Sequence, residues 1–165
     1  MKILSSQRSR FLSVPVLAVC AALMLPPVGS AMAADPPGNN GTIKIDGRPF
    51  DTHPDNQPHV GCAFQLDFYG YDQGNFYADV RFTVHPPTGQ AVVLRTDRVF
   101  VGEDAAGGGT DLDAARTYNL SSALRSFTPH PKQGYHIKVE VTAPHSIGAD
   151  TKYKVFWVES CGYPS

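Results

Sequence analysis

Two stretches of this chain alternate strictly between apolar and polar side chains. Apolar residues occupy every second position from Ala78 to Val84 and again from Tyr135 to Val141. Because successive side chains of a β-strand point to opposite faces, this period of two predicts strands with one face buried and the other in water. An amphipathic helix needs a period of 3.6 residues, and no stretch of the chain shows that period convincingly.

Shorter alternating runs cover 42–45, 64–68 and 152–157, and the apolar stretches 92–94 and 99–101 fit a strand or a bent pair of strands. Residues 118–124 fit either a strand or one short helical turn. Turns rich in Gly, Pro, Asn and Asp separate these segments. About seven short strands with such turns predict a single all-β domain, an antiparallel sandwich. In the last run we expect Tyr153, Val155 and Trp157 to face the core.

Residues 1–33 have the three parts of a cleavable secretory signal peptide. Basic residues without any acid come first, an apolar region follows from Phe11, and Ala31-Met32-Ala33 is a small-x-small cleavage site. We expect cleavage after Ala33 or Ala34. Prolines interrupt the apolar region, which therefore falls short of the ~18 residues that a membrane-spanning helix needs.

A lipid anchor is the alternative to release. Leu17-Ala18-Val19-Cys20 resembles a lipobox, in which the cysteine is lipidated. Val19, however, stands where a lipobox normally has Gly, Ala or Ser, and the cleavage site downstream competes with it.

The mature chain is predicted to comprise a flexible leader (34–40) and one β domain (41–165). Cleavage leaves 11 basic residues against 15 acidic ones, a net charge of −4. This balance argues against a nucleic-acid binder, which needs a basic surface. No second apolar segment follows, so we expect a secreted, extracellular monomer without a membrane span.

Two cysteines remain after cleavage, Cys62 and Cys161, and we expect them to form a disulfide bond. A metal-binding or redox pair is a weaker interpretation, because neither lies in a CxxC motif. Closing a loop of about 100 residues stabilises a domain by roughly 4–5 kcal/mol in the chain-entropy model. Cys62 lies two positions before Phe64, and Cys161 lies four positions after Trp157. An even spacing along a strand puts two side chains on the same face, so we expect both cysteines to point inward.

Four segments together resemble a group of small secreted proteins of high-GC Gram-positive bacteria. They are GTIKIDG at 41–47, PHVGC at 58–62, the run 64–70 and KVFWVESC at 154–161. The resemblance covers nearly all of the mature chain and implies an exported, disulfide-linked, immunoglobulin-like β domain. No activity is known for this group, so it assigns no functional residues here.

The first candidate site is a polar loop at 51–59. Its imidazoles and carboxylates are ligands suited to zinc or copper: Asp51, His53, Asp55 and His59. Their spacing matches no standard metal motif. The alternative is a solvated turn whose path is set by its prolines.

The second candidate site is an acidic, glycine-rich loop at 102–113. Glu103, Asp104, Asp111 and Asp113 could supply the several oxygen ligands that calcium requires. The spacing is not that of an EF-hand. The alternative is a long mobile loop that its acids keep soluble.

Four aromatic residues cluster around the turn 72–75: Tyr69, Tyr71, Phe76 and Tyr77. Exposed, they would form a surface on which sugars or a protein could bind. Buried, they would close one end of the sandwich.

The sequence therefore favours a secreted binding module that presents the loops 51–59, 71–75 and 103–113 to an extracellular protein or glycan. The alternative is a secreted metal-binding protein or a small hydrolase. No catalytic residue can be assigned, because the chain has no G-x-S-x-G motif and no cysteine left over for a Cys/His pair.

Overall fold

The computed structural model describes residues 41–105, 107–143 and 150–160. By its internal contacts the chain divides into Met1–Ala34 and Asp35–Ser165, and every described residue belongs to the second unit. The predicted signal peptide, the leader and Cys161 lie outside the described residues. No helix within the described ranges is long and apolar enough to cross a membrane.

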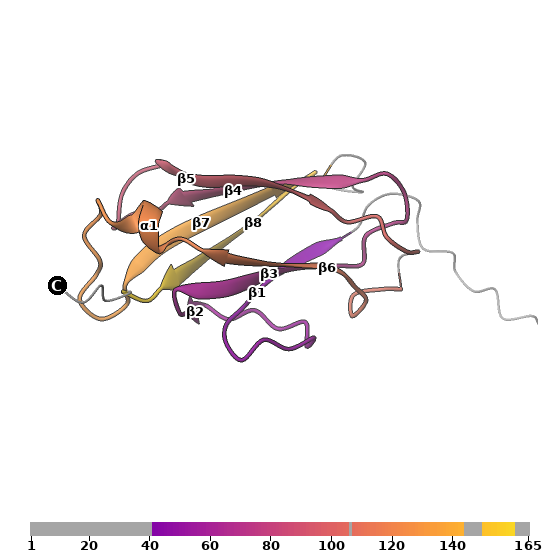
Figure 1. Ribbon diagram of the computed structural model, residues 1–165, viewed down its shortest axis with the longest axis horizontal. Coiled ribbons are helices and arrows are strands. Elements are labelled where there is room, and N and C mark those ends of the chain that lie inside the picture. The colour runs from indigo at the N-terminus through magenta and orange to yellow at the C-terminus, as the bar shows by residue number, and fades with distance from the viewer. Residues whose placement is uncertain (1–40, 106, 144–149, 161–165) are drawn as a thin grey trace, which may run out of the picture. The chain divides into compact units, whose positions relative to one another are not determined.

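The described chain is all-β, as its alternating pattern predicts (Figure 1). The strands are β1 (Thr42–Asp46), β2 (His59–Val60), β3 (Ala63–Tyr69), β4 (Tyr77–Val84), β5 (Val93–Phe100), β6 (Leu112–Asn119), β7 (Tyr135–Thr142) and β8 (Thr151–Val158). One helical turn, α1 (Ser121–Leu124), follows β6, so residues 118–124 are partly strand and partly helix. The strand β6 was not predicted over its whole length, because as a sheet edge it buries few of its side chains.

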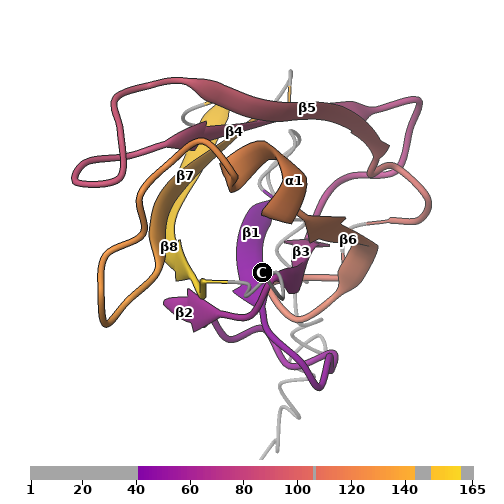
Figure 2. The same cartoon turned by 60° about the vertical axis from the view of Figure 1, so that its left-hand side comes forward.

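The strands form two sheets, one of three strands in the order β1-β3-β6 and one of five in the order β2-β8-β7-β4-β5. Figure 2 shows the larger sheet curving from β2 to β5 around β1 and β3. All pairs are antiparallel except β2 with β8, which is parallel. The expectation of a fully antiparallel fold is therefore wrong at β2. β1 belongs to the smaller sheet. The chain then crosses to the larger sheet, where β2 pairs with β8.

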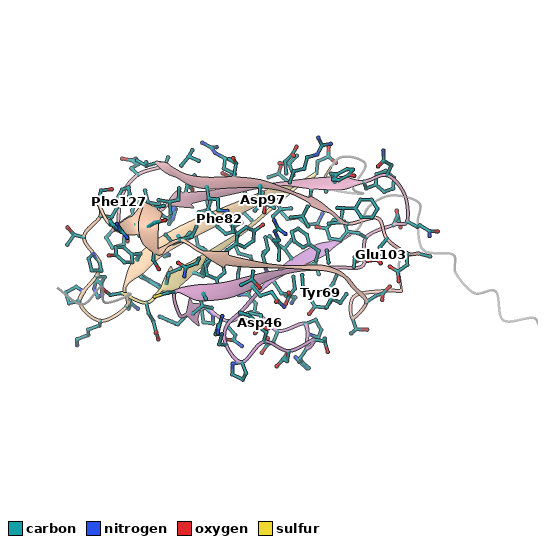
Figure 3. All side chains as sticks on the ribbon, in the orientation of Figure 1. Asp46, Tyr69, Phe82, Asp97, Glu103 and Phe127 are labelled. Atoms are coloured by element: carbon teal, nitrogen blue, oxygen red, sulfur yellow. The ribbon has the colours of Figure 1, made fainter. Side chains whose placement is uncertain are left out.

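Aromatic side chains from both sheets meet in the core. The ring of Phe64 on β3 contacts Phe82 on β4 and Phe156 on β8 edge-on, with centroids 5.8 and 5.1 Å apart. Phe82, labelled in Figure 3, also meets Tyr118 of β6 at 4.7 Å. Every apolar residue of the Ala78–Val84 alternation is buried, which confirms that prediction. Burial of each such large side chain contributes about 1.5–3 kcal/mol.

The predicted orientation of β8 is wrong. Phe156 and Val158 are buried, whereas Tyr153 and Val155 are 64% and 41% exposed. Apolar residues occupy both faces of this strand, so alternation alone cannot choose between them. Lys152 and Lys154 lie on the same side of β8 as the buried Phe156 and Val158. Their aliphatic stems can cover apolar surface while the ammonium groups reach water. Burial lowers the pKa of both lysines.

Candidate functional site

The loop 47–58 covers the outer face of the three-stranded sheet. Asp46 holds this loop: its Oδ2 accepts a hydrogen bond from the Asp51 amide at 2.9 Å, and its Oδ1 accepts one from the Gln57 side chain at 3.2 Å. The Tyr69 hydroxyl donates to the Thr52 carbonyl at 3.4 Å. Figure 3 shows Asp46 and Tyr69 on the side of the molecule where this loop runs. The outer face of this sheet is therefore occupied by the chain itself.

Asp67 is fully buried on the three-stranded sheet. The pKa of this carboxyl is raised to about 6, mainly by burial and in smaller part by the charges of Asp46, Asp51 and Asp55. An interaction with the Gln65 side chain offsets part of the rise. An ionisable group thus lies buried beneath a loop that brings further acids close to it.

The loop at 51–59 does not bring its predicted ligands together as a metal site. Within the described ranges, the one group of three or more potential ligands at coordinating distance lies elsewhere. Asp51 instead accepts a hydrogen bond from the His53 amide at 2.7 Å. His59 belongs to β2, where its ring stacks against Trp157. Asp55 is exposed. Asp46 and Tyr69 hold this segment by hydrogen bonds, so it resembles the alternative interpretation, a polar turn, more than a metal site.

The loop at 102–113 does gather three of its four acids. One carboxylate oxygen from each of Asp104, Asp111 and Asp113 lies within 4.8 Å of the others, and we call these three residues the acidic cluster. The fourth acid, Glu103, is exposed and does not belong to the cluster. Figure 3 shows Glu103 at the end of the strands.

Asp113 is the buried member of the acidic cluster, with 5% of its surface exposed. Its Oδ2 accepts a hydrogen bond from the Tyr71 amide at 2.8 Å, whereas its Oδ1 has no partner among the described residues. The pKa of this carboxyl is raised to about 6, mainly by burial and in smaller part by the charges of Asp111 and Asp104, while the hydrogen bond from the Tyr71 amide lowers it.

Tyr69 and Tyr71 are fully buried and therefore cannot form the exposed aromatic surface considered from the sequence. The ring of Tyr71 packs against Phe68 at 6.0 Å and closes one end of the core. Phe76 packs against the core while partly exposed. Tyr77 is 36% exposed and contacts Phe100 on the neighbouring strand β5 at 5.2 Å.

The outer face of the five-stranded sheet carries the exposed apolar side chains. Within the described residues, every exposed large hydrophobic belongs to this sheet or directly precedes β5: Tyr77, Val92, Val93, Phe100, Tyr153 and Val155. We call the outward side chains of β4, β5, β7 and β8, together with His59, the outer-sheet surface. A shallow cavity of about 550 Å³ on it is lined by charged and hydroxyl side chains, among them Arg81, Arg98 and Glu140.

A row of aromatic rings crosses one end of this surface. Trp157 of β8 stacks on His136 of β7, its register partner, with centroids 4.3 Å apart. His59 of β2 lies on the other side of the indole at 6.5 Å, and His85 meets His136 at 4.9 Å. Burial lowers the pKa of His85, and the charges of His136 and Lys138 lower it further.

Apart from His59, which was a candidate metal ligand, the members of this row are absent from the sequence-based candidates. Its members come from four separate segments, and Trp157 was expected to face the core. If Phe156 and Val158 are taken as the inward-facing residues of β8, the sequence places Trp157 on the outer face of the sheet.

Cys62 lies beside the segment that follows β8. Its Sγ lies 3.9 Å from the carbonyl oxygen of Glu159, two residues before Cys161. Because Cys161 lies outside the described residues, the disulfide bond stays a prediction.

Comparison with protein-family models, with curated proteins and with solved structures finds no match for the chain.

Proposed function

We propose that this chain is a secreted binding domain that holds a protein partner on its outer-sheet surface. One observation carries the proposal: the two sheets differ in how their outer faces are covered. The loop 47–58 covers the smaller sheet, whereas the larger sheet leaves Tyr153, Val155 and Phe100 exposed. Large exposed apolar side chains gathered on one face of a soluble domain, among polar ones, commonly mark an interaction site.

The chemistry of this surface favours a protein over a glycan. Sugars stack on open aromatic ring faces, but here cations already lie over two of the rings. The Arg98 guanidinium is 4.7 Å from the Tyr77 centroid, and the Lys138 ammonium is 5.0 Å from that of Tyr153. Trp, Tyr and Arg are the residue types that contribute most at protein interfaces.

Charges of both signs alternate with these rings. Glu140 pairs with Lys138 at 3.2 Å and with Arg81 at 3.9 Å, and Arg98 pairs with Asp79 at 3.8 Å. Such a mixture supports a partner of mixed charge rather than a polyanion. The side chains project from hydrogen-bonded strands, which reduces the entropy lost when they are ordered by a partner.

The proposal includes an immunoglobulin-like fold. The order β8-β7-β4-β5 opposite β1-β3-β6 corresponds to the G-F-C-C′ and A-B-E strands of such domains. A Cys62–Cys161 disulfide would tie the segment before β3 to the segment after β8. The signal-peptide pattern and the resemblance to small exported proteins support a location outside the cell.

A site-specific photocrosslinker at position 153 tests this function. The purified protein with the crosslinker at Tyr153 is irradiated with extracellular proteins of the producing cells. A matched control carries it at Thr117, which is exposed on β6 of the other sheet. We expect a discrete protein adduct from position 153 that excess unmodified protein competes away, and none from position 117.

Equal adducts from both positions, or no adduct from position 153, would contradict the proposal. Retention of the protein on purified wall polysaccharide, lost in a Tyr153→Ala variant, would instead identify the partner as a glycan.

A further inference from the structure

The acidic cluster lies where the end of β3 meets the start of β6. Asp113 is the second residue of β6, and Asp104 and Asp111 belong to the loop that leads into that strand. This location is separate from the aromatic row of the outer-sheet surface. A function for the acidic cluster therefore goes beyond the binding function proposed above.

Three carboxylates crowded together repel one another unless something positive lies between them. The described structure places no lysine or arginine in an ion pair with any of the three. Asp111 accepts a hydrogen bond from the Gly107 amide at 2.7 Å, and Asp113 accepts one from the Tyr71 amide. These two bonds satisfy one oxygen of each residue.

The second, independent observation is the other oxygen of Asp113. Only 5% of the surface of Asp113 is exposed, and its Oδ1 has no hydrogen-bond partner among the described residues. A buried carboxylate oxygen without a partner is unfavourable, so such atoms in folded proteins usually face a ligand or water. Among the described residues, Asp113 belongs to the one group of three or more potential ligands whose ligand atoms all lie within 4.8 Å of one another.

We infer that Asp104, Asp111 and Asp113 form a calcium-binding site. The donors are oxygens only, and oxygen ligands suit calcium, magnesium and manganese, whereas zinc and copper prefer imidazole or thiolate. Calcium accepts irregular sets of six to eight oxygens, while magnesium demands near-octahedral geometry. The three carboxylates offer at most six oxygens, and water would complete the shell.

Glycines give the backbone the close approach that this site needs. A Cβ on Gly107 would lie 2.4 Å from Asp111 Oδ2, so any side chain there would displace the carboxylate. Gly70, with φ +69°, donates its amide to the Asp111 carbonyl at 3.0 Å and fastens the loop to the end of β3. The run 107–109 can then adjust around an ion.

Thermal unfolding of the purified protein tests the inference. After dialysis against EDTA, the unfolding midpoint is measured with calcium, magnesium or zinc chloride added singly. We expect calcium at about 100 times its dissociation constant to raise the midpoint by several degrees, and magnesium to raise it less. Isothermal titration should give one calcium ion per chain.

Two variants with the same change of charge locate the site. Asp113→Asn should abolish the calcium-dependent rise, whereas Glu103→Gln, in the same loop but outside the acidic cluster, should retain it. If Asp113→Asn does not fold, the exposed Asp104 gives a second variant, Asp104→Asn, in which calcium affinity should fall at least tenfold. A protein whose midpoint and calorimetric signal do not respond to calcium, or a calcium response unchanged in both aspartate variants, overturns the inference.

Discussion

The carboxylate of Asp97 on β5 lies 3.2 Å from Nε of Arg116 on β6 and so joins the edge strands of the two sheets. The same oxygen, Oδ2, accepts a hydrogen bond from the Tyr118 hydroxyl, also at 3.2 Å. The Arg98 amide, Arg116 and Tyr118 hold the pKa of Asp97 below its usual range, against the opposing effect of burial. Figure 3 shows Asp97 on the inner side of β5.

We expect Asp97→Ala to lower the free energy of unfolding by about 1–3 kcal/mol, because it leaves the hydroxyl of the buried Tyr118 without its acceptor. Urea denaturation measures the change. Asp79→Ala is the matched control, since Asp79 pairs at 3.8 Å with an exposed Arg98 and should cost no more than about 1 kcal/mol. Equal losses in the two variants would show that the link between sheets contributes nothing.

Asp67 makes the stability of the protein depend on pH. Because its pKa is about 6 in the folded state and 3.8 otherwise, the folded chain binds the extra proton between these values. Stability therefore falls as the pH rises through this range. Asp46, Asp51 and Asp55 are the acids that face it, and their charges act in the same direction.

We expect Asp67→Asn to remove this dependence. Its stability relative to the original protein should increase between pH 4 and pH 7 by on the order of 3 kcal/mol. Urea denaturation at the two pH values measures the difference, and the other acids cancel because both proteins contain them. Parallel pH profiles would mean that Asp67 is not the group responsible.

The core contact of Phe82 with Phe64 and Tyr118 should dominate the stability of the packed sheets. We expect Phe82→Ala to cost about 3–5 kcal/mol, because it leaves a cavity that the two sheets cannot close. Phe100→Ala, on the outer-sheet surface, removes the same ring from a side chain that is 42% exposed and should cost far less. Similar urea midpoints for the two variants would contradict the assigned core.

Gly70 combines a positive φ of +69° with a close neighbour, since a Cβ there would lie 3.0 Å from the Gly108 carbonyl oxygen. We expect Gly70→Ala to destabilise the fold by about 1–2 kcal/mol. Gly109→Ala is the control from the facing loop, because a Cβ at that position meets nothing within 4 Å. A larger fall in thermal midpoint for Gly109→Ala than for Gly70→Ala would refute this account.

The strands of the larger sheet could be read from the sequence where only one face of the strand is apolar. Ala78–Val84 and Tyr135–Val141 are of this kind, and their buried faces are as predicted. At β8 the pattern is ambiguous, because Val155, Phe156 and Trp157 are consecutive and put large apolar side chains on both faces of the strand. Packing of Phe156 on Phe64 decides the orientation, and that contact joins residues 92 positions apart.

The acids of the loop 102–113 could be named from the sequence, but not which of them converge. Asp113 is buried where the pairing of β3 with β6 is irregular, and the loop brings Asp111 and Asp104 close to it. Glu103 has the same charge but is exposed and lies outside the acidic cluster. The position of a carboxylate in such a loop depends on the backbone path, which long-range pairing with β3 sets.

The sequence by itself determined that this chain forms short strands and which face β4 and β7 bury, because side-chain alternation is a local property of the backbone. Only the tertiary structure decided which outer face is bare and which is covered. The loop 47–58 buries Asp67 and Tyr69 through contacts with Asp46 and Gln57, while β2, β7 and β8 bring His59, His136 and Trp157 into one row. These arrangements depend on pairing between distant segments, whose free energy comes from burial across the whole domain and not from any local pattern.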